Sequence, residues 1–250
     1  MIPKIVHESW HEPLRHLWDD PRLALIQKQL AYFKFCPEAK NIFRAFSLPI
    51  TSVRIVMIAL APYQKVSGDN QLYATGLAMG VPDGYDTETL KSVRDALWND
   101  YRDLRSEDLN PTLEHWHNQG VMLLNKGLTV TQNSSNPREH IYSREYDRFQ
   151  WPGWEWFTSG VVEAIDRYCN SIVFAFLGKE AGEYAELVSG KNYIEHAPHP
   201  VARYYYMRAN PGKEVPKHID FATCELFKRI DDITYNIDKT KINWYEVKGS

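Results

Sequence analysis

Four short apolar segments constrain the fold of this chain more than any other feature. Three of them, residues 53–60, 121–125 and 171–177, are rich in β-branched, leucine or aromatic residues and too short for ordinary helices, and a weaker fourth covers residues 192–197. Each is followed by proline, glycine or polar residues. This pattern is typical of the buried strands of a parallel sheet.

Stretches with helical spacing of apolar residues separate these strands, and another precedes them, at residues 20–33, 87–101, 154–168 and 179–189. Asp20 can cap the first helix, and Pro21 suits its first turn. We therefore expect an α/β fold in one domain of residues 1–250, with a short, mainly parallel four-stranded central sheet flanked by helices on both faces. In such folds, ligands bind at the carboxyl ends of the strands.

Composition narrows the class of protein further. With 250 residues, 44% of them hydrophobic, the chain can bury a sizeable core. A net charge of -3 weighs against broad non-specific binding of nucleic acid, although it leaves room for a local basic face. The three cysteines are widely spaced, which argues against a disulfide framework or a metal site. We expect a soluble cytoplasmic protein without metal, cofactor or membrane contact, because no apolar run could span a bilayer and the N-terminus is too polar for a signal peptide.

The residues after each strand are the candidates for a functional site. These segments read ALAPYQ at 59–64, NKGLTV at 125–130, GK at 178–179 and APHP at 197–200. Taken singly they decide nothing, because an asparagine that ends a strand is usually a turn former. A histidine between prolines is usually an exposed loop residue, and Pro62-Tyr63 is by itself a turn.

The order of several segments along the chain adds information. These segments match motifs of one family: IFRAF at 42–46, ALAPYQ in the place of a GQDPYH loop, GLAMGV at 76–81 for GLCFSV, GVMLLNKGLTV at 120–130 for GVLLLNxxLTV, WFT at 156–158 for WxxFT, APHP for HPSP, and INW at 242–244 for IDW. The chain thus resembles the uracil-DNA glycosylases over nearly its whole length. The resemblance implies their fold and a monofunctional glycosylase that flips a pyrimidine out of DNA and hydrolyses its bond to the sugar.

Site roles follow from the resemblance. It implies that Asn125 reads the edge of the base, since an amide both donates and accepts. It implies that His199 donates to the base carbonyl as negative charge develops there. Tyr63 stands where the family places a ring against C5 of the base. Gly178 is expected to allow a close approach of the backbone.

The base pocket departs from the family at several places. Beside Leu60 and Pro62, Ala61 replaces the Asp that normally activates water, and Gln64 replaces the closing His. A distant branch of the superfamily has a similar GLAPA-type loop, so this change is compatible with activity. Met79 replaces the aromatic ring that stacks on the base. Ala61 and Met79 together predict a roomier pocket than one that is strict for uracil. Asp69, in a longer loop, could supply a catalytic carboxylate, although a solvated turn residue is the better-supported alternative.

Contacts with DNA are predicted on both sides of this pocket. Ser134 and Ser135 lie in a polar loop that can donate to phosphates. After His199, arginines alternate with tyrosines, which suits phosphate contact and stacking; the alternative is a helix with a buried tyrosine face. The residues singled out are Arg203, Tyr204, Tyr205 and Arg208. Residues 209–217 form an insertion relative to the family that is expected to reshape this contact.

Two classes of function remain open. The first is a monomeric glycosylase acting on single- or double-stranded DNA, either on uracil in repair or on a bulkier pyrimidine such as the glucosylated 5-hydroxymethylcytosine of phage DNA, in antiviral defence. The second is a catalytically inactive module that binds DNA or a partner; Ala61 supports it, while Asn125 and His199 argue against it. A nucleotide hydrolase has no support, because no Walker motif is present.

Overall fold

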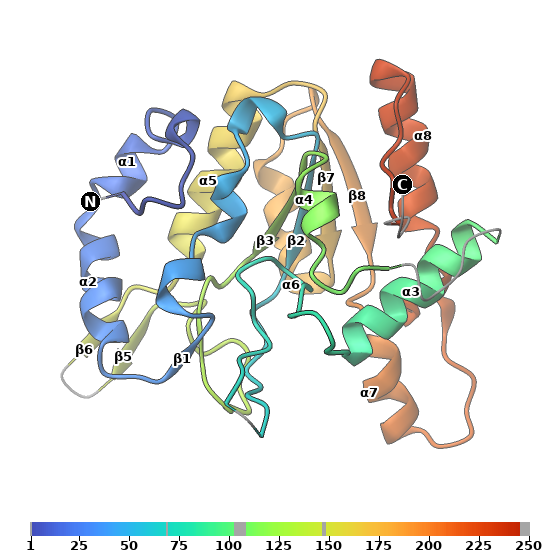
Figure 1. Ribbon diagram of the computed structural model, residues 1–250, viewed down its shortest axis with the longest axis horizontal. Coiled ribbons are helices and arrows are strands. Elements are labelled where there is room, and N and C mark those ends of the chain that lie inside the picture. The colour runs from blue at the N-terminus through green and yellow to red at the C-terminus, as the bar shows by residue number, and fades with distance from the viewer. Residues whose placement is uncertain (1, 69, 103–108, 147–148, 246–250) are drawn as a thin grey trace.

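A parallel sheet of four strands lies at the centre of the molecule. The computed structural model describes residues 2–68, 70–102, 109–146 and 149–245. The sheet has the order β3-β2-β7-β8, with the strands β2 (Ile55–Ala59), β3 (Val121–Asn125), β7 (Val173–Leu177) and β8 (Tyr193–Ala197). Helices α5 and α8 lie on opposite sides of it (Figure 1). The predicted α/β architecture is confirmed, and each strand falls within two residues of its predicted range.

Helices connect and cover the strands. Their bounds are α1 (Arg15–Trp18), α2 (Pro21–Leu30), α3 (Glu88–Asp100), α4 (Glu114–His117), α5 (Glu155–Tyr168), α6 (Lys179–Gly182), α7 (Ala202–Ala209) and α8 (Leu226–Asp238). As predicted, the Asp20 side chain caps α2 by accepting from the backbone N–H of Arg22, and Pro21 is its first residue. Two small antiparallel pairs flank the main sheet: β1 (Phe35–Cys36) with β4 (Val130–Thr131), and β5 (Arg144–Tyr146) with β6 (Phe149–Trp151).

The helix predicted for residues 179–189 is shorter than expected. The α-helical part ends at Gly182, and a 3-10 helix follows over Glu183–Leu187. Two local causes favour this break. Glycine costs about 1 kcal/mol in a helix interior relative to alanine. The ammonium of Lys126 also takes the carbonyl of Glu180, which an α-helix would offer to its own backbone.

Burial explains why the strands could be predicted so closely. Every residue of β2, β3 and β7 is buried, so these strands read as unbroken apolar runs. β8 lies at the edge of the sheet, and most of its residues are half-buried or exposed, which accounts for its weaker pattern. Among the described residues, no helix has the length and apolar character needed to cross a membrane.

Candidate active site

The carboxyl ends of the four strands lie at one edge of the sheet, at the bottom of the view in Figure 1. Ala59 of β2 is in register with Asn125 of β3, and Leu177 of β7 is in register with Ala197 of β8. The pairing continues past the strands, because the backbone N–H of Lys126 donates to the Ala59 carbonyl at 2.8 Å. The segments that follow the strands therefore lie along the same edge, as ligand-binding residues of an open parallel sheet do.

Asn125 is the last residue of β3 and is almost completely buried. Its Oδ1 atom makes no hydrogen bond with any residue that the structure describes. A buried polar atom without a partner costs free energy, so native proteins rarely keep one without a function. The Asn125 amide is therefore suited to receive a hydrogen-bond donor from a ligand at the sheet edge.

His199 lies in the loop between β8 and α7 and is a neutral donor. The backbone N–H of Val201 donates to its Nδ1 at 3.4 Å. A ring nitrogen that accepts carries no proton, which places the hydrogen of the neutral ring on Nε2. Burial lowers the pKa of the His199 imidazole. At neutral pH the ring can thus donate through Nε2 without bringing a charge into the site.

Gly178, the residue after β7, permits the close approach predicted for it. Its φ of +92° lies in the region that favours glycine, and a Cβ there would lie 3.0 Å from Cβ of His199. A side chain at position 178 would therefore displace the histidine loop.

Two charged residues that sequence reasoning missed act on His199. Arg138 Nε donates to Glu180 Oε1 at 2.5 Å. After burial, which has the largest effect, the Glu180 carboxylate raises the pKa of His199 and the Arg138 guanidinium lowers it. The proximity of Glu180 to Gly178 in the chain was an available signal. No comparable signal pointed to Arg138, because it lies 61 residues before His199 in the sequence.

Tyr63 is held rigidly at the start of the loop after β2. Its hydroxyl donates to the Met79 carbonyl at 3.0 Å and lies 3.1 Å from Thr87 Oγ1. Burial raises the pKa of the Tyr63 hydroxyl to about 12, so the ring remains a neutral phenol. Met79 is itself buried and has a φ of +66°, a backbone conformation that is unusual for a side chain with a Cβ. Tyr63 and Met79 thus form one fixed unit rather than two independent walls.

The rest of the loop after β2 is anchored to the segment after β3. The Leu60 carbonyl accepts from Gly127 N–H at 2.9 Å, and Pro62 is buried. Ala61, which lies between them, is half-buried and carries no group that could activate water. Asp69, the predicted alternative carboxylate, lies outside the described residues.

Gln64 joins the loop predicted to bind phosphate to the loop that is predicted to form the base pocket. Its carbonyl accepts from Asn133 N–H at 2.7 Å, which brings Ser134 and Ser135 next to the loop after β2. The Nε2 atom of Gln64 is buried and makes no hydrogen bond with the described part of the chain. Ser135 is exposed, whereas Ser134 Oγ already accepts from the backbone of Asn136 at 3.1 Å. Of the two serines, Ser135 is the freer to contact a phosphate.

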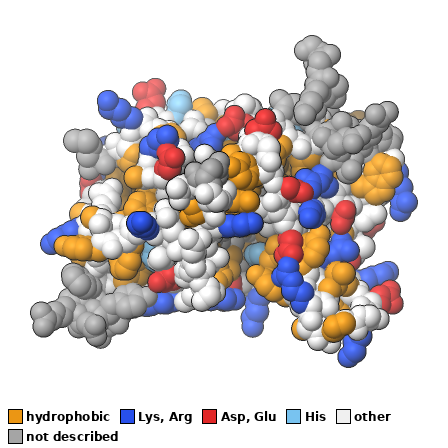
Figure 2. Space-filling model, turned by 60° about the horizontal axis from the view of Figure 1, so that its bottom comes forward, with side chains coloured by type: hydrophobic (Ala, Val, Ile, Leu, Met, Phe, Trp, Pro, Cys, Tyr) orange, Lys and Arg blue, Asp and Glu red, His pale blue; other side chains and the backbone are white. Residues whose placement is uncertain are grey.

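Both arginines predicted to contact DNA are paired with carboxylates. Arg203 NH1 lies 3.2 Å from Asp95 of α3 and 3.4 Å from Asp220. Arg208 forms an ion pair with Glu88, also of α3. These pairs fix α7 against α3 and neutralise much of its charge. Accordingly, Figure 2 shows basic and acidic side chains interspersed over this face rather than one continuous basic patch.

The tyrosines of α7 do not form the buried face that was the alternative to a role in DNA contact. Residues 202–209 do form a helix, but none of them is fully buried. Tyr205 is 64% exposed, and Arg208 lies 5.9 Å from the centre of its ring. Tyr204 lies beside Arg203 in a similar way, at 5.7 Å. Tyr205 therefore presents an open aromatic surface close to His199 in the chain.

A buried serine holds the His199 loop in place through a hydrogen bond. Ser92 of α3 is fully buried, and its hydroxyl donates to the Pro200 carbonyl at 2.5 Å. Nothing in the sequence connects these residues, which are 108 positions apart. α3 thus positions both the loop that carries His199 and the helix that follows it.

Lys126, directly after Asn125, is fully buried and was also missed. Its ammonium donates to Glu183 Oε2 at 2.5 Å and to the Glu180 carbonyl at 3.0 Å, and lies 3.6 Å from Glu155 Oε1. The ring of Tyr184 lies 4.7 Å away. These contacts anchor the end of β3 to α5 and α6. Among the described residues, no group of three or more His, Cys, Asp or Glu side chains is placed to hold a metal ion.

Comparison with curated proteins identifies relatives of this chain. A uracil-DNA glycosylase of Buchnera aphidicola is 32% identical over 214 residues, which cover 84% of this chain and 83% of the relative. One of Mycoplasmopsis pulmonis is 30% identical over 210 residues, which cover 83% and 81%. No family model matches the chain.

Solved structures share the fold. The crystal structure of mimivirus uracil-DNA glycosylase aligns with a TM-score of 0.77 at 18% identity and covers 96% of this chain and 87% of that chain. A structure from Nitratifractor salsuginis aligns with a TM-score of 0.56 at 20% identity and covers 91% and 92%. The sequence relatives, at 30% identity or more over most of both chains, show that the chain belongs to the uracil-DNA glycosylase family.

Proposed function

We propose that this protein is a DNA glycosylase that flips a pyrimidine out of DNA and hydrolyses the bond between the base and its sugar. The observation that carries the proposal is the buried Asn125 amide, whose Oδ1 has no partner among the described residues and lies at the same sheet edge as His199. A scaffold without a ligand would gain nothing from such an unpaired group. The names of the curated relatives support the same activity.

The site residues suggest how the reaction proceeds. The C1′–N1 bond breaks with its electron pair moving to the base, and the oxygen of a water molecule forms the new bond to C1′. That water gives up one proton, and the base anion takes up one proton from solvent. His199 Nε2–H donates to the base carbonyl as negative charge grows there, which lowers the barrier most when the donor is already in place. Asn125 holds the edge of the base, and the ring of Tyr63 limits the space at C5. The products are a free base and an abasic site.

Two features support a monofunctional hydrolase that acts as a monomer. A lyase activity would need a free amine near the sugar, and Lys126, the residue after Asn125, cannot supply it because its ammonium is bonded to Glu183 and to the Glu180 carbonyl. The four strand-end segments also come from one chain, so no second copy is needed to complete the site.

Uracil is the substrate that the relatives' names favour, and a bulkier pyrimidine is a second candidate. The second rests on Ala61, which ends at Cβ where the family carries a carboxylate, and on Met79 in place of an aromatic ring. Both changes leave more room around the base. An enzyme for a modified base of phage DNA would serve antiviral defence, whereas one for uracil would serve repair.

An excision assay on labelled oligonucleotides tests the function. The panel contains uracil, thymine, 5-hydroxymethyluracil, 5-hydroxymethylcytosine and its glucosylated form, in single and double strands, followed by alkaline cleavage of abasic sites. Excision of one base by the wild type, lost in Asn125→Ala and His199→Ala but kept in the exposed controls Asn170→Ala and His11→Gln, supports the proposal. DNA binding without excision of any base would instead favour the inactive binding module.

A further inference from the structure

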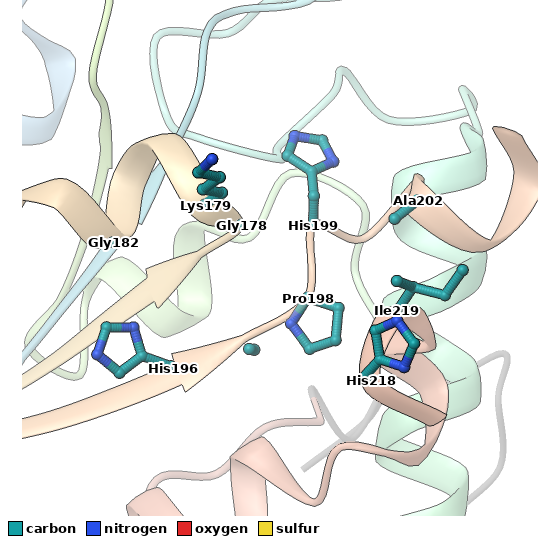
Figure 3. Close-up of a pocket in the computed structure, with 10 residues that line it drawn as sticks. Gly178, Lys179, Gly182, His196, Pro198, His199, Ala202, His218 and Ile219 are labelled. Carbon is teal, nitrogen blue, oxygen red and sulfur yellow. The ribbon is translucent and has the colours of Figure 1, made fainter. Parts of the chain in front are cut away.

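Helix α3 contacts two of the loops that follow the strands. Its N-cap residue, Thr87, lies with Oγ1 3.1 Å from the Tyr63 hydroxyl in the loop after β2. Its second turn carries Ser92, whose hydroxyl donates to the Pro200 carbonyl beside His199 in the loop after β8. Figure 3 shows His199 on this second loop, with α3 in pale green near it. One helix thus holds the side chain expected at C5 of the base and the loop that carries the donor to its carbonyl.

The spacing of these two contacts fits the spacing of the strands. Thr87 and Ser92 are five positions apart, which corresponds to about 7–8 Å along a helix axis. β2 and β8 lie on either side of β7, so their ends are about 10 Å apart at the usual distance between strands. Helix α3 can therefore hold the loops after both strands at the same time.

A continuous chain of hydrogen bonds joins α3 to the ring of Tyr63. The backbone N–H of Leu90 donates to Thr87 Oγ1 at 3.2 Å. The Tyr63 hydroxyl donates to the Met79 carbonyl at 3.0 Å. Because a phenol has a single hydrogen, the hydroxyl that donates between Thr87 and Tyr63 is that of Thr87. A shift of the Tyr63 ring away from the pocket would therefore break a hydrogen bond on each side of its oxygen.

Discrimination at C5 depends on how firmly this ring is held. A methyl or hydroxymethyl group at C5 needs the space that the Tyr63 ring fills, so a base that carries one enters only if the ring shifts. A hydrogen bond between neutral groups changes an equilibrium constant by about fivefold. Tyr63 supplies the ring, and Thr87 supplies part of the free energy that opposes its movement.

We propose that Thr87 is a specificity-determining residue, which makes the site select against pyrimidines with a substituent at C5 by holding the ring of Tyr63 in place. The proposal rests on the proposed function, because it takes the flipped base to lie between Asn125, His199 and Tyr63. Thr87 acts through Tyr63 and is a positioning residue. Of the two candidate substrates, a ring held at C5 favours uracil over the bulkier pyrimidine.

Binding of DNA that cannot be cleaved tests this role. The duplexes carry 2′-fluoro-2′-deoxyuridine or its 5-methyl derivative, whose bonds to the base resist hydrolysis because fluorine withdraws electrons from the sugar. Selectivity is the ratio of the two association constants, uridine over its 5-methyl derivative, measured by fluorescence anisotropy. The variants are Thr87→Val, which keeps the volume but loses the hydroxyl, Thr87→Ser, which keeps the hydroxyl, Tyr63→Phe, and the double variant Y63F/T87V.

The selectivity should follow the hydrogen bonds. T87V should lower it about fivefold, and T87S should stay within about twofold of the wild type. Y63F should lower it at least as far as T87V, because the phenol oxygen takes part in both bonds, and Y63F/T87V should match Y63F. Wild-type selectivity in T87V would overturn the proposal. A further fall from Y63F to Y63F/T87V would also overturn it, because Thr87 would then act by a route other than Tyr63.

Two control variants separate this role from a general loss of stability. Asp20→Ala removes the N-cap of α2, as Thr87→Val does for α3, and the two helices lie at opposite ends of the view in Figure 1. It should keep the wild-type selectivity. Ser92→Ala loosens the His199 loop instead and should weaken the binding of both duplexes by the same factor. Selectivity lowered as far in either control as in T87V would overturn the assignment to Thr87.

The outcome for Thr87 is independent of base excision. If the wild type binds the duplexes with selectivity but excises no base, the glycosylase proposal fails, and the selectivity of the variants still decides the role of Thr87. A wild type that binds both duplexes equally well would overturn the role of Thr87, whether or not it excises uracil. With an active enzyme, the ratio of kcat/KM for uracil over 5-hydroxymethyluracil should fall in T87V by about the same factor as the binding selectivity.

Discussion

Removing the carboxylates around Lys126 is expected to destabilise the protein far more than removing the lysine itself. The ammonium is 0% exposed, whereas the side chains of Glu155 and Glu183 are 42% and 51% exposed. In the variant E155Q/E183Q the ammonium loses both counter-charges and stays out of water. Leaving a buried charge unpaired costs about 3–5 kcal/mol, which corresponds to a fall in Tm of about 6–20 °C for a chain of this size.

The reverse change should be mild. In Lys126→Met the two carboxylates can turn toward water, and methionine fills the same volume, so the free energy of unfolding should fall by about 1 kcal/mol or less. The triple variant K126M/E155Q/E183Q should resemble K126M, because no charge is then left buried.

Urea unfolding of the four proteins, followed by circular dichroism, measures this cycle. Because the triple variant should lose no more stability than K126M, the coupling between the lysine and the carboxylates should be about 3–5 kcal/mol. Strictly additive losses in the triple variant, or a K126M protein as unstable as E155Q/E183Q, would refute the view that desolvation of the ammonium governs this cluster.

Three further changes have defined outcomes. In Gly178→Ala the new Cβ would lie 3.0 Å from His199 Cβ, at a residue with a φ of +92°. This variant should reduce kcat at least about tenfold, measured by single-turnover excision, and should lower the free energy of unfolding by about 1–2 kcal/mol, measured by urea unfolding. Burial lowers the pKa of His140 from 6.5 to about 4, so below pH 6.5 the unfolded chain binds a proton that the folded chain excludes. The free energy of unfolding should therefore fall by about 3 kcal/mol between pH 6.5 and 4. This dependence on pH should disappear in His140→Gln. Tyr63→Phe loses the hydrogen bond to the Met79 carbonyl and should lower kcat/KM about fivefold with a change in Tm of only a few degrees, and an unchanged kcat/KM would show that the ring is held by packing alone.

The sheet was predictable because its strands are buried on both faces. β2, β3 and β7 leave unbroken apolar runs, and their ends pointed directly to Asn125 and to the loop with Tyr63. The pairs β1–β4 and β5–β6 were not predicted, because strands of two or three residues leave no periodic pattern.

The partners of charged residues could not be read from the sequence. Arg203 and Arg208 follow His199 and invite an assignment to DNA, but each is paired with a carboxylate of α3 that lies more than 100 residues earlier. No pattern in the sequence marked Lys126 as a buried ion, because its counter-charges, Glu155 and Glu183, are brought to it only by the tertiary structure. Such contacts depend on tertiary structure, which short-range pattern does not encode.

The separation of strands and loops at the sheet edge bears on how such an enzyme can change its substrate. Asn125 belongs to a strand within the rigid core, while His199 is fixed by Ser92 through the Pro200 carbonyl. The segments most open to a ligand, such as Ser135 and the residues of the 209–217 loop, lie in connections between elements. Doubling the length of such a connection costs only about 0.6 kcal/mol of closure entropy. New substrates can therefore evolve by insertion into these loops, while Asn125 and His199 keep their geometry.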